Sequence, residues 1–106
     1  GGGRYLKEEA VKEFSRCQYC DSANMRGLGF DRQREVGNTA NSASELSFGH
    51  SGFTGTFLWM DPVYNLVYVF LSNRVYPTRE NTLLYKMNVR TDILQTVYDL
   101  LEQTPR

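Results

Sequence analysis

The sequence lacks three features, each of which would have pointed to a class of protein. No apolar stretch approaches the roughly 18 to 20 residues that a membrane-spanning helix needs. The first residues carry no apolar segment of signal-peptide type, so either the protein is cytoplasmic or its export signal precedes this sequence. Twelve Lys and Arg residues balance twelve Asp and Glu residues and form no run. We therefore expect no nucleic-acid partner and no anionic membrane surface.

Cysteine and histidine are scarce as well, with two cysteines and one histidine in 106 residues. A structural zinc site would need four ligands, so we expect no metal and no cofactor. Cys17 and Cys20 form a lone Cys-x-x-Cys after a helical pattern, whereas a reactive thiol of thioredoxin type would lie at a helix start. Buried thiols or a local disulfide are the favoured interpretations, and thiol redox chemistry stays an alternative.

Apolar periodicity predicts a helix near each end of the chain. Residues 6–17 carry apolar side chains at helical spacing and predict a short amphipathic helix. Residues 89–102 carry a clearer stripe with a period of 3.6 residues and predict a longer helix. Asn88 can serve as the N-cap of this second helix, and Pro105 prevents its continuation.

The middle of the chain predicts strands. Residues 53–60 and 66–72 are rich in aromatic and β-branched side chains and are joined by turn residues, which favours an antiparallel hairpin. Residues 27–33 are a third strand candidate, and residues 36–47 are typical of a solvent-exposed loop. We therefore expect an α+β fold, in which an antiparallel sheet of about three strands carries the C-terminal helix on one face.

The strand at residues 66–71 is apolar on both of its faces. Leu66, Tyr68 and Phe70 alternate with Val67, Val69 and Leu71. One long helix covers one face, and the short first helix can hardly shield the other. Leaving several such side chains in water would forfeit roughly 1.5 to 3 kcal/mol for each. We therefore expect residues 1–106 to form a single partial domain, which packs against a missing remainder or self-associates through the exposed face.

The stretch Ser47 to Thr56 is the richest in glycine, hydroxyl groups and histidine. Taken by itself it is the glycine-rich start of a strand, or a β-bulge with incidental hydroxyls. His50 and Ser51 are neighbours in a strand and point to opposite faces, so they cannot readily pair as base and nucleophile. The chain also contains no Gly-x-Ser-x-Gly nucleophile elbow.

The run Phe48 to Thr56 resembles a motif of class C β-lactamase-like serine hydrolases, which include penicillin-binding-protein-like carboxypeptidases and esterases. Asp61-Pro62, residues 69–74 and the final helix follow it in the order that these proteins have, and residues 26–30 resemble the strand before the motif. The resemblance covers nearly all of this chain but only the C-terminal portion of such a domain. It implies a fragment of the β-lactamase/transpeptidase-like fold. Residues 70–77 also resemble hydrolase domains of Bacteroides-like bacteria, which are sometimes fused behind a glycosidase domain.

The third motif of that family is Lys-Thr-Gly, or His-Thr-Gly and His-Ser-Gly in many relatives, and His50, Ser51 and Gly52 match it. The resemblance implies that His50 and Ser51 contact substrate and that Gly52 lets the strand lie against it. It also implies that the backbone N–H of Phe53 is one of two oxyanion-hole donors. Histidine in place of lysine weakens any claim to true β-lactamase activity.

The family nucleophile belongs to a Ser-x-x-Lys motif, and no serine of this chain is followed three places later by lysine. Acyl-enzyme chemistry needs a nucleophile beside its base, so we expect the chain to be inactive alone. The resemblance implies a parent hydrolase of the periplasm or cell envelope, which acts on a small amide or ester or on cell-wall peptide. The rival hypothesis is a free-standing interaction module that oligomerises through its apolar sheet face.

Overall fold

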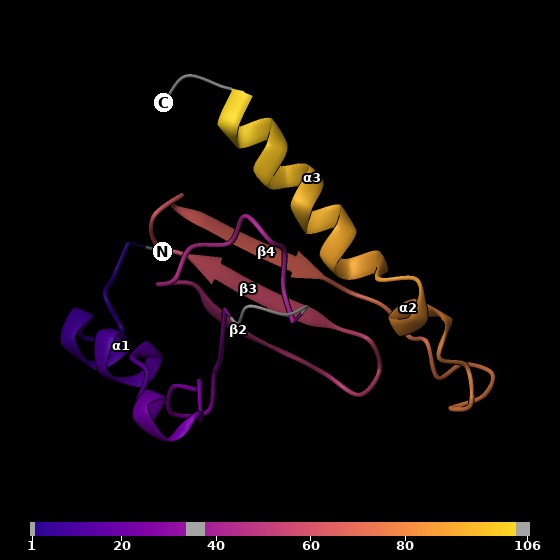
Figure 1. The fold of residues 1–106 in the computed structure, drawn as a ribbon, viewed down its shortest axis with the longest axis horizontal. Helices are drawn as coiled ribbons and strands as arrows, with labels where there is room; N and C mark the ends of the chain where they lie inside the picture. Colours follow the sequence, from indigo (N-terminus) through magenta and orange to yellow (C-terminus); the bar gives the residue numbers. More distant parts are fainter. Residues whose placement is uncertain (1, 34–37, 104–106) are drawn as a thin grey trace.

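The structure, a computed structural model, describes residues 2–33 and 38–103. Its elements in chain order are α1 (Glu8–Ser15), the 3-10 turn η1 (Cys20–Ser22), β1 (Asp31–Arg32), β2 (Phe48–Ser51), β3 (Phe57–Asp61), β4 (Leu66–Phe70), α2 (Leu83–Lys86) and α3 (Val89–Gln103). The strands form one antiparallel sheet in the order β1-β2-β3-β4 (Figure 1). The predicted α+β fold with a C-terminal helix is therefore confirmed. The sheet has four strands where about three were expected.

The additional strand is β2, which precedes the predicted strand at residues 53–60 and is separated from β3 by a turn. β2 ends at Ser51, and β3 begins only at Phe57. Between them the N–H of Gly55 donates to the carbonyl of Gly52 over 3.0 Å and closes a four-residue turn. Gly55 has a φ of 97°, which side-chain-bearing residues rarely adopt. The glycines of this motif thus make a tight turn.

The predicted hairpin is confirmed, with β3 and β4 paired from Phe57↔Phe70 to Asp61↔Leu66. The Asp61 carboxylate accepts the N–H of Val63 over 3.0 Å at the start of the connecting turn. Asn65 has a φ of 52° at its end, a conformation that asparagine tolerates better than most residues. Asp61 and Asn65 therefore explain why the turn between β3 and β4 forms where the sequence predicts it.

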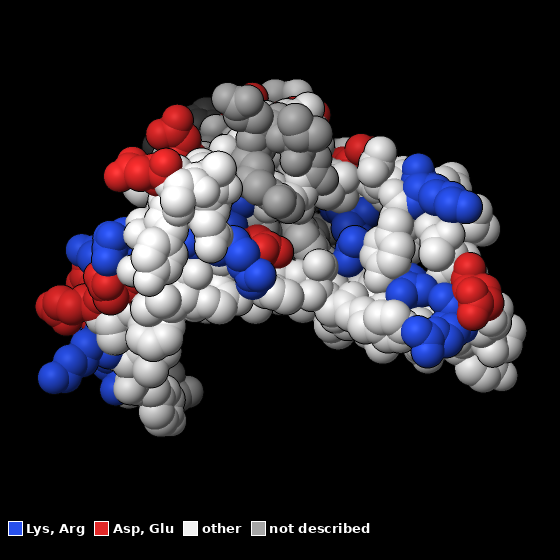
Figure 2. Space-filling model, turned by 60° about the horizontal axis from the view of Figure 1, so that its bottom comes forward, with Lys and Arg blue, Asp and Glu red and all other residues white. Residues whose placement is uncertain are grey.

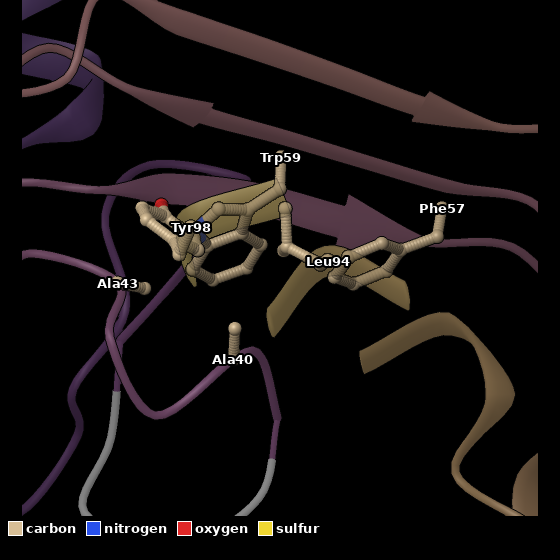
Figure 3. Close-up of a cluster of buried hydrophobic side chains, with 6 residues drawn as sticks. All are labelled: Ala40, Ala43, Phe57, Trp59, Leu94 and Tyr98. Atoms are coloured by element: carbon tan, nitrogen blue, oxygen red, sulfur yellow. The ribbon is translucent and has the colours of Figure 1, made fainter. Parts of the chain in front are cut away.

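The core lies between the sheet and α3. Trp59 is 1 % exposed and stacks on Phe57 with 5.6 Å between ring centroids. Leu94 and Tyr98 of α3 are fully buried against the same face (Figure 3). The predicted helical stripe thus supplies one side of the core, although its deepest members are Leu94 and Tyr98, while Ile93 and Leu100 are exposed.

Residues 38–47, the described part of the loop predicted at residues 36–47, form no helix or strand, but the expected solvent exposure is wrong for four of them. Thr39, Ala40, Ala43 and Ser47 are buried, and the two alanines point toward Trp59 (Figure 3). Small side chains let this backbone approach the indole closely, so a composition typical of loops packs into the core here. Residues 36 and 37 lie outside the described residues.

The opposite face of the sheet has little cover. Directly paired residues of an antiparallel sheet share a face, so the pairs Leu58↔Val69 and Met60↔Val67 lie together on it. Val67 is 67 % exposed and Val69 is 57 % exposed. α1 has no buried residue. Figure 2 shows an arched molecule with charged side chains gathered toward both ends and a hollow underside bordered largely by uncharged atoms.

Candidate active site

The resemblance motif lies at the end of β2, where the strand runs into the turn. His50 pairs with Leu58 and Ser51 pairs with Phe57. Since paired residues share a face, the His50 side chain lies on the sparsely covered face and the Ser51 side chain lies on the α3 face. The expectation that they point to opposite faces is confirmed, so a ligand reaches both only around the edge of the strand.

That edge is open. β1 pairs only with Phe48 and Gly49, so among the described residues no strand continues alongside His50 and Ser51. The N–H of Gly52 donates to the carbonyl of Thr56 over 2.8 Å. Backbone direction alternates along an antiparallel strand, so the N–H of Ser51 points away from β3, toward the open edge.

Phe53 continues this outward edge. Its N–H is opposite the Gly52 carbonyl in their shared peptide plane, and that carbonyl accepts the Gly55 N–H inside the turn. The Phe53 N–H therefore points out of the turn, and no acceptor among residues 2–33 and 38–103 receives it. Within the described part of the chain, this N–H is therefore left to donate to a group outside the chain.

Hydrogen bonds fix the His50 imidazole in one orientation. Its Nδ1 lies 2.7 Å from the Ser51 carbonyl oxygen, which can only accept, so Nδ1 carries the proton. Nε2 is then the acceptor for Nη2 of Arg26, 3.2 Å away. Arg26 in turn pairs with Asp31 over 3.3 Å. A guanidinium thus lies beside the His50 imidazole at the end of β2. Arg26 lies in the segment 26–30 that resembles the family strand before the motif, but no pattern in the sequence around it indicated a contact with His50.

Ser51 borders a hollow on the α3 face with a volume of about 340 Å³. Asp31, Phe57, Tyr85 and Arg90 also line it. Its lining is mixed, with polar groups from β1 and α3 around aromatic rings. A small polar ligand would therefore fit better than a purely apolar one.

The chain itself leaves no room for a side chain at Gly49, and a side chain at Gly52 would require the Thr56 side chain to move. A Cβ on Gly52 would run into the Thr56 hydroxyl across the turn, and one on Gly49 would run into the Leu58 carbonyl and the Trp59 ring. The family resemblance implies that Gly52 lets a substrate lie close to the strand. The contact with Thr56 is a separate reason, within the chain itself, for a glycine at this position.

The cysteines and the other metal-binding side chains form no further site in the described part of the chain. Cys17 and Cys20 are joined in a local disulfide, so neither is a free thiol. Among the described residues, no group of three or more His, Cys, Asp and Glu side chains is placed to hold a metal ion. Within that same part of the chain, no helix has the length and apolarity to cross a bilayer.

Besides Ser-x-x-Lys, the proteins that the motif resembles carry a Tyr-x-Asn or Ser-x-Asn element as their second motif. The tripeptide Ser22-Ala23-Asn24 of this chain has the Ser-x-Asn spacing. Its side chains are engaged locally, because Ser22 Oγ donates to the Tyr19 carbonyl and Asn24 Oδ1 accepts the N–H of Arg26. These bonds shape the turn after the disulfide. The spacing alone therefore does not make it part of the site.

Comparison with known proteins agrees with the motif. No curated protein and no solved structure matches the chain. A family model described as Beta-lactamase matches residues 5–89, which include β1 to β4, the turn after β2 and α2. Since this match covers most of the 106 residues, the chain belongs to the Beta-lactamase family.

Proposed function

We propose that this chain is the C-terminal part of a serine hydrolase of the class C β-lactamase-like or penicillin-binding-protein-like type, and that it forms one wall of an active site. The observation that carries the proposal is the open edge at residues 50–53, with the outward, unpaired N–H of Phe53. The nucleophile and its lysine belong to a portion that precedes this sequence. The chain alone is inactive.

In the parent enzyme, a substrate would lie along the open edge of β2. The Phe53 N–H would then donate to the oxyanion that forms when the nucleophile attacks an amide or ester carbonyl. One such donor is worth about 3 to 4 kcal/mol of transition-state stabilisation. The Arg26 guanidinium beside His50 supplies a positive charge where the family has lysine, which suits a substrate with a carboxylate, such as cell-wall peptide.

The parent's remaining residues would cover the face that carries Val67 and Val69. They would also supply the wall opposite His50, because His50 lies on that face. A cell-wall substrate places the parent in the periplasm or cell envelope.

The first test measures turnover by the isolated chain with a chromogenic β-lactam and with an aryl ester. We expect no turnover above buffer, and turnover that a serine-directed reagent abolishes would refute the inactivity. The second test sequences the gene upstream, where a Ser-x-x-Lys motif in the same reading frame is expected. If it is there, the longer protein should hydrolyse the ester, and Ser→Ala at the motif should abolish this. Lys7→Ala, a change at an exposed N-terminal residue, is the matched control.

The rival function is an interaction module, and the exposed valines of β4 favour it. A module would form a stable oligomer in light scattering, and Val67→Lys together with Val69→Lys would dissociate it. A reading frame that begins close to Gly1 and contains no Ser-x-x-Lys would support the module over the hydrolase.

A further inference from the structure

Five planar side chains stack alternately at one end of the sheet. The guanidinium carbon of Arg74 lies 4.7 Å from the ring centroid of Phe53 and 4.6 Å from that of Tyr85. The guanidinium carbon of Arg90 lies 4.7 Å from the Tyr85 ring and 5.5 Å from the Phe57 ring. The order is therefore Phe53, Arg74, Tyr85, Arg90, Phe57. We call this set the arginine-aromatic ladder.

The ladder joins segments that are distant in the sequence. Phe53 lies in the turn after β2, and Phe57 begins β3. Arg74 follows β4, Tyr85 belongs to α2 and Arg90 belongs to α3. Figure 1 shows this turn on the same side of the molecule as α2 and the start of α3. The two ends of the ladder therefore bracket the turn, and its middle comes from the segment that follows the sheet.

Hydrogen bonds tie the same turn to the same segment. Tyr85 Oη donates to the Phe53 carbonyl over 3.1 Å, and Arg74 Nε donates to Tyr85 Oη over 2.6 Å. The backbone N–H of Arg74 donates to the Thr54 carbonyl over 2.9 Å. Arg90 Nη1 reaches the carbonyls of Gly55 and Thr56, which are next along the turn. Each consecutive carbonyl of residues 53–56 thus accepts a donor from residues 74–90.

These contacts decide the direction of the Phe53 N–H. The peptide plane before Phe53 is held by the Gly52 carbonyl, which accepts the Gly55 N–H. The peptide plane after Phe53 is held by Tyr85 Oη. With both planes held, the backbone angles of Phe53 have little freedom, so its N–H keeps one direction. The Phe53 ring is 60 % exposed, and the guanidinium carbons of Arg74 and Arg79 lie 4.7 Å and 5.4 Å from its centroid, which favours this orientation of the ring.

We propose that the arginine-aromatic ladder preorganises the Phe53 peptide, with Tyr85 and Arg74 as positioning residues that hold the N–H toward the open edge. Donors that are already aimed avoid a reorganisation cost when charge develops, which is why their position matters. The catalytic meaning of this assignment rests on the proposed function. The preorganisation itself is a property of this chain and can be measured without substrate.

The experiment is ¹⁵N relaxation on the labelled chain. In the unchanged protein we expect an order parameter near 0.85 for the Phe53 N–H, the value of a rigid backbone. Tyr85→Leu removes the central ring and its hydroxyl, and should lower that order parameter below about 0.6. Tyr85→Phe keeps the ring and loses only the bond to the Phe53 carbonyl, so an intermediate value is expected. Arg74→Lys keeps the charge without the planar stack and should also be intermediate.

Tyr76→Leu is the matched control, since Tyr76 lies in the same connection but is largely exposed. It should leave the Phe53 value unchanged. In every variant the amides of β3 and β4 and the fluorescence of Trp59 should stay native, which separates a local loosening from unfolding. An unchanged Phe53 order parameter in folded Tyr85→Leu overturns the proposal, as does an equal loss across the whole sheet. Failure of a longer protein to hydrolyse any ester would overturn the proposed function and leave this result intact.

Discussion

Replacing Tyr98 by Phe removes a single oxygen from a buried hydrogen-bond network and so tests how that network stabilises the fold. Tyr98 Oη donates to Oδ2 of Asp61 over 2.6 Å, and Asp61 is 1 % exposed. The same carboxylate accepts the Ser44 hydroxyl over 2.6 Å and the Ser44 N–H over 2.9 Å. The network thus joins α3, the end of β3 and the buried segment 38–47.

The expected loss at pH 7 is about 1.5 to 3 kcal/mol in the free energy of unfolding. A hydrogen bond to a charged group contributes about 1.5 to 3 kcal/mol, and the ring that fills the core stays in place. Tyr68→Phe is the matched control, because the Tyr68 hydroxyl donates to a neutral carbonyl, that of Arg90, over 3.2 Å. Its expected loss is about 0.5 to 1.5 kcal/mol.

The loss for Tyr98→Phe should shrink in acid. Burial by itself would raise the pKa of Asp61, but hydrogen bonds from the hydroxyls of Ser44 and Tyr98 and from two backbone N–H groups outweigh it, so the pKa lies below its ordinary value. A carboxyl with a lowered folded pKa stabilises the fold above its unfolded pKa of about 3.9, and this contribution is lost as the pH falls through the folded value. Once Asp61 is protonated in both states, the Tyr98 bond has a neutral acceptor and is worth about 1 kcal/mol.

Urea unfolding followed by the fluorescence of Trp59, which is buried and is the single tryptophan, measures both variants at pH 7 and at falling pH until Asp61 is protonated in the folded protein. Tyr98→Phe should lose more stability than Tyr68→Phe at pH 7, and the difference should narrow as Asp61 takes up its proton. Equal losses before and after this protonation would show that the carboxylate charge is irrelevant. The reasoning about Asp61 would then be wrong.

Two further predictions concern the faces of the sheet. Leu94→Ala should destabilise the fold by about 2 to 5 kcal/mol because it empties a fully buried site. Val69→Ser on the other face should change the free energy of unfolding by no more than about 0.5 kcal/mol. Urea unfolding measures both variants, and similar losses would contradict the unequal burial of the two sheet faces. Gly49→Ala should cost about 1 to 3 kcal/mol, because its Cβ meets the Trp59 ring and the Leu58 carbonyl. A neutral result in thermal unfolding would mean that the strand shifts to make room.

Sequence patterns predicted the helices, strands and turns that are determined by residues close together in the chain. The stripe at residues 89–102 predicted α3, because helical spacing gathers apolar side chains on one side wherever the helix packs. Turn residues between two apolar runs predicted the hairpin of β3 and β4. The motif also predicted correctly that His50 and Ser51 lie on opposite faces, since alternation is a property of the strand alone.

Features that depend on distant partners could not be predicted in this way. The segment at residues 38–47 is rich in small and polar residues, which is typical of exposed loops, and the burial of part of it depends on Trp59 and Asp61 across the core. The arginine-aromatic ladder is likewise invisible in sequence, because Phe53, Arg74 and Tyr85 meet only after the sheet and the segment behind it have folded. Short-range propensity carries no information about such meetings.

The position of His50 connects the energetics of the sheet with its proposed chemistry. His50 shares a face with Leu58 and Val69, so the histidine lies beside apolar side chains that would gain stability from burial. Any layer that covers those side chains also brings atoms opposite the imidazole and lowers the local dielectric around Arg26 and the Phe53 edge. A charge-stabilising site gains strength when water is excluded. On the proposed function, the burial that completes the fold would therefore also complete the site, and neither would be achieved by this chain alone.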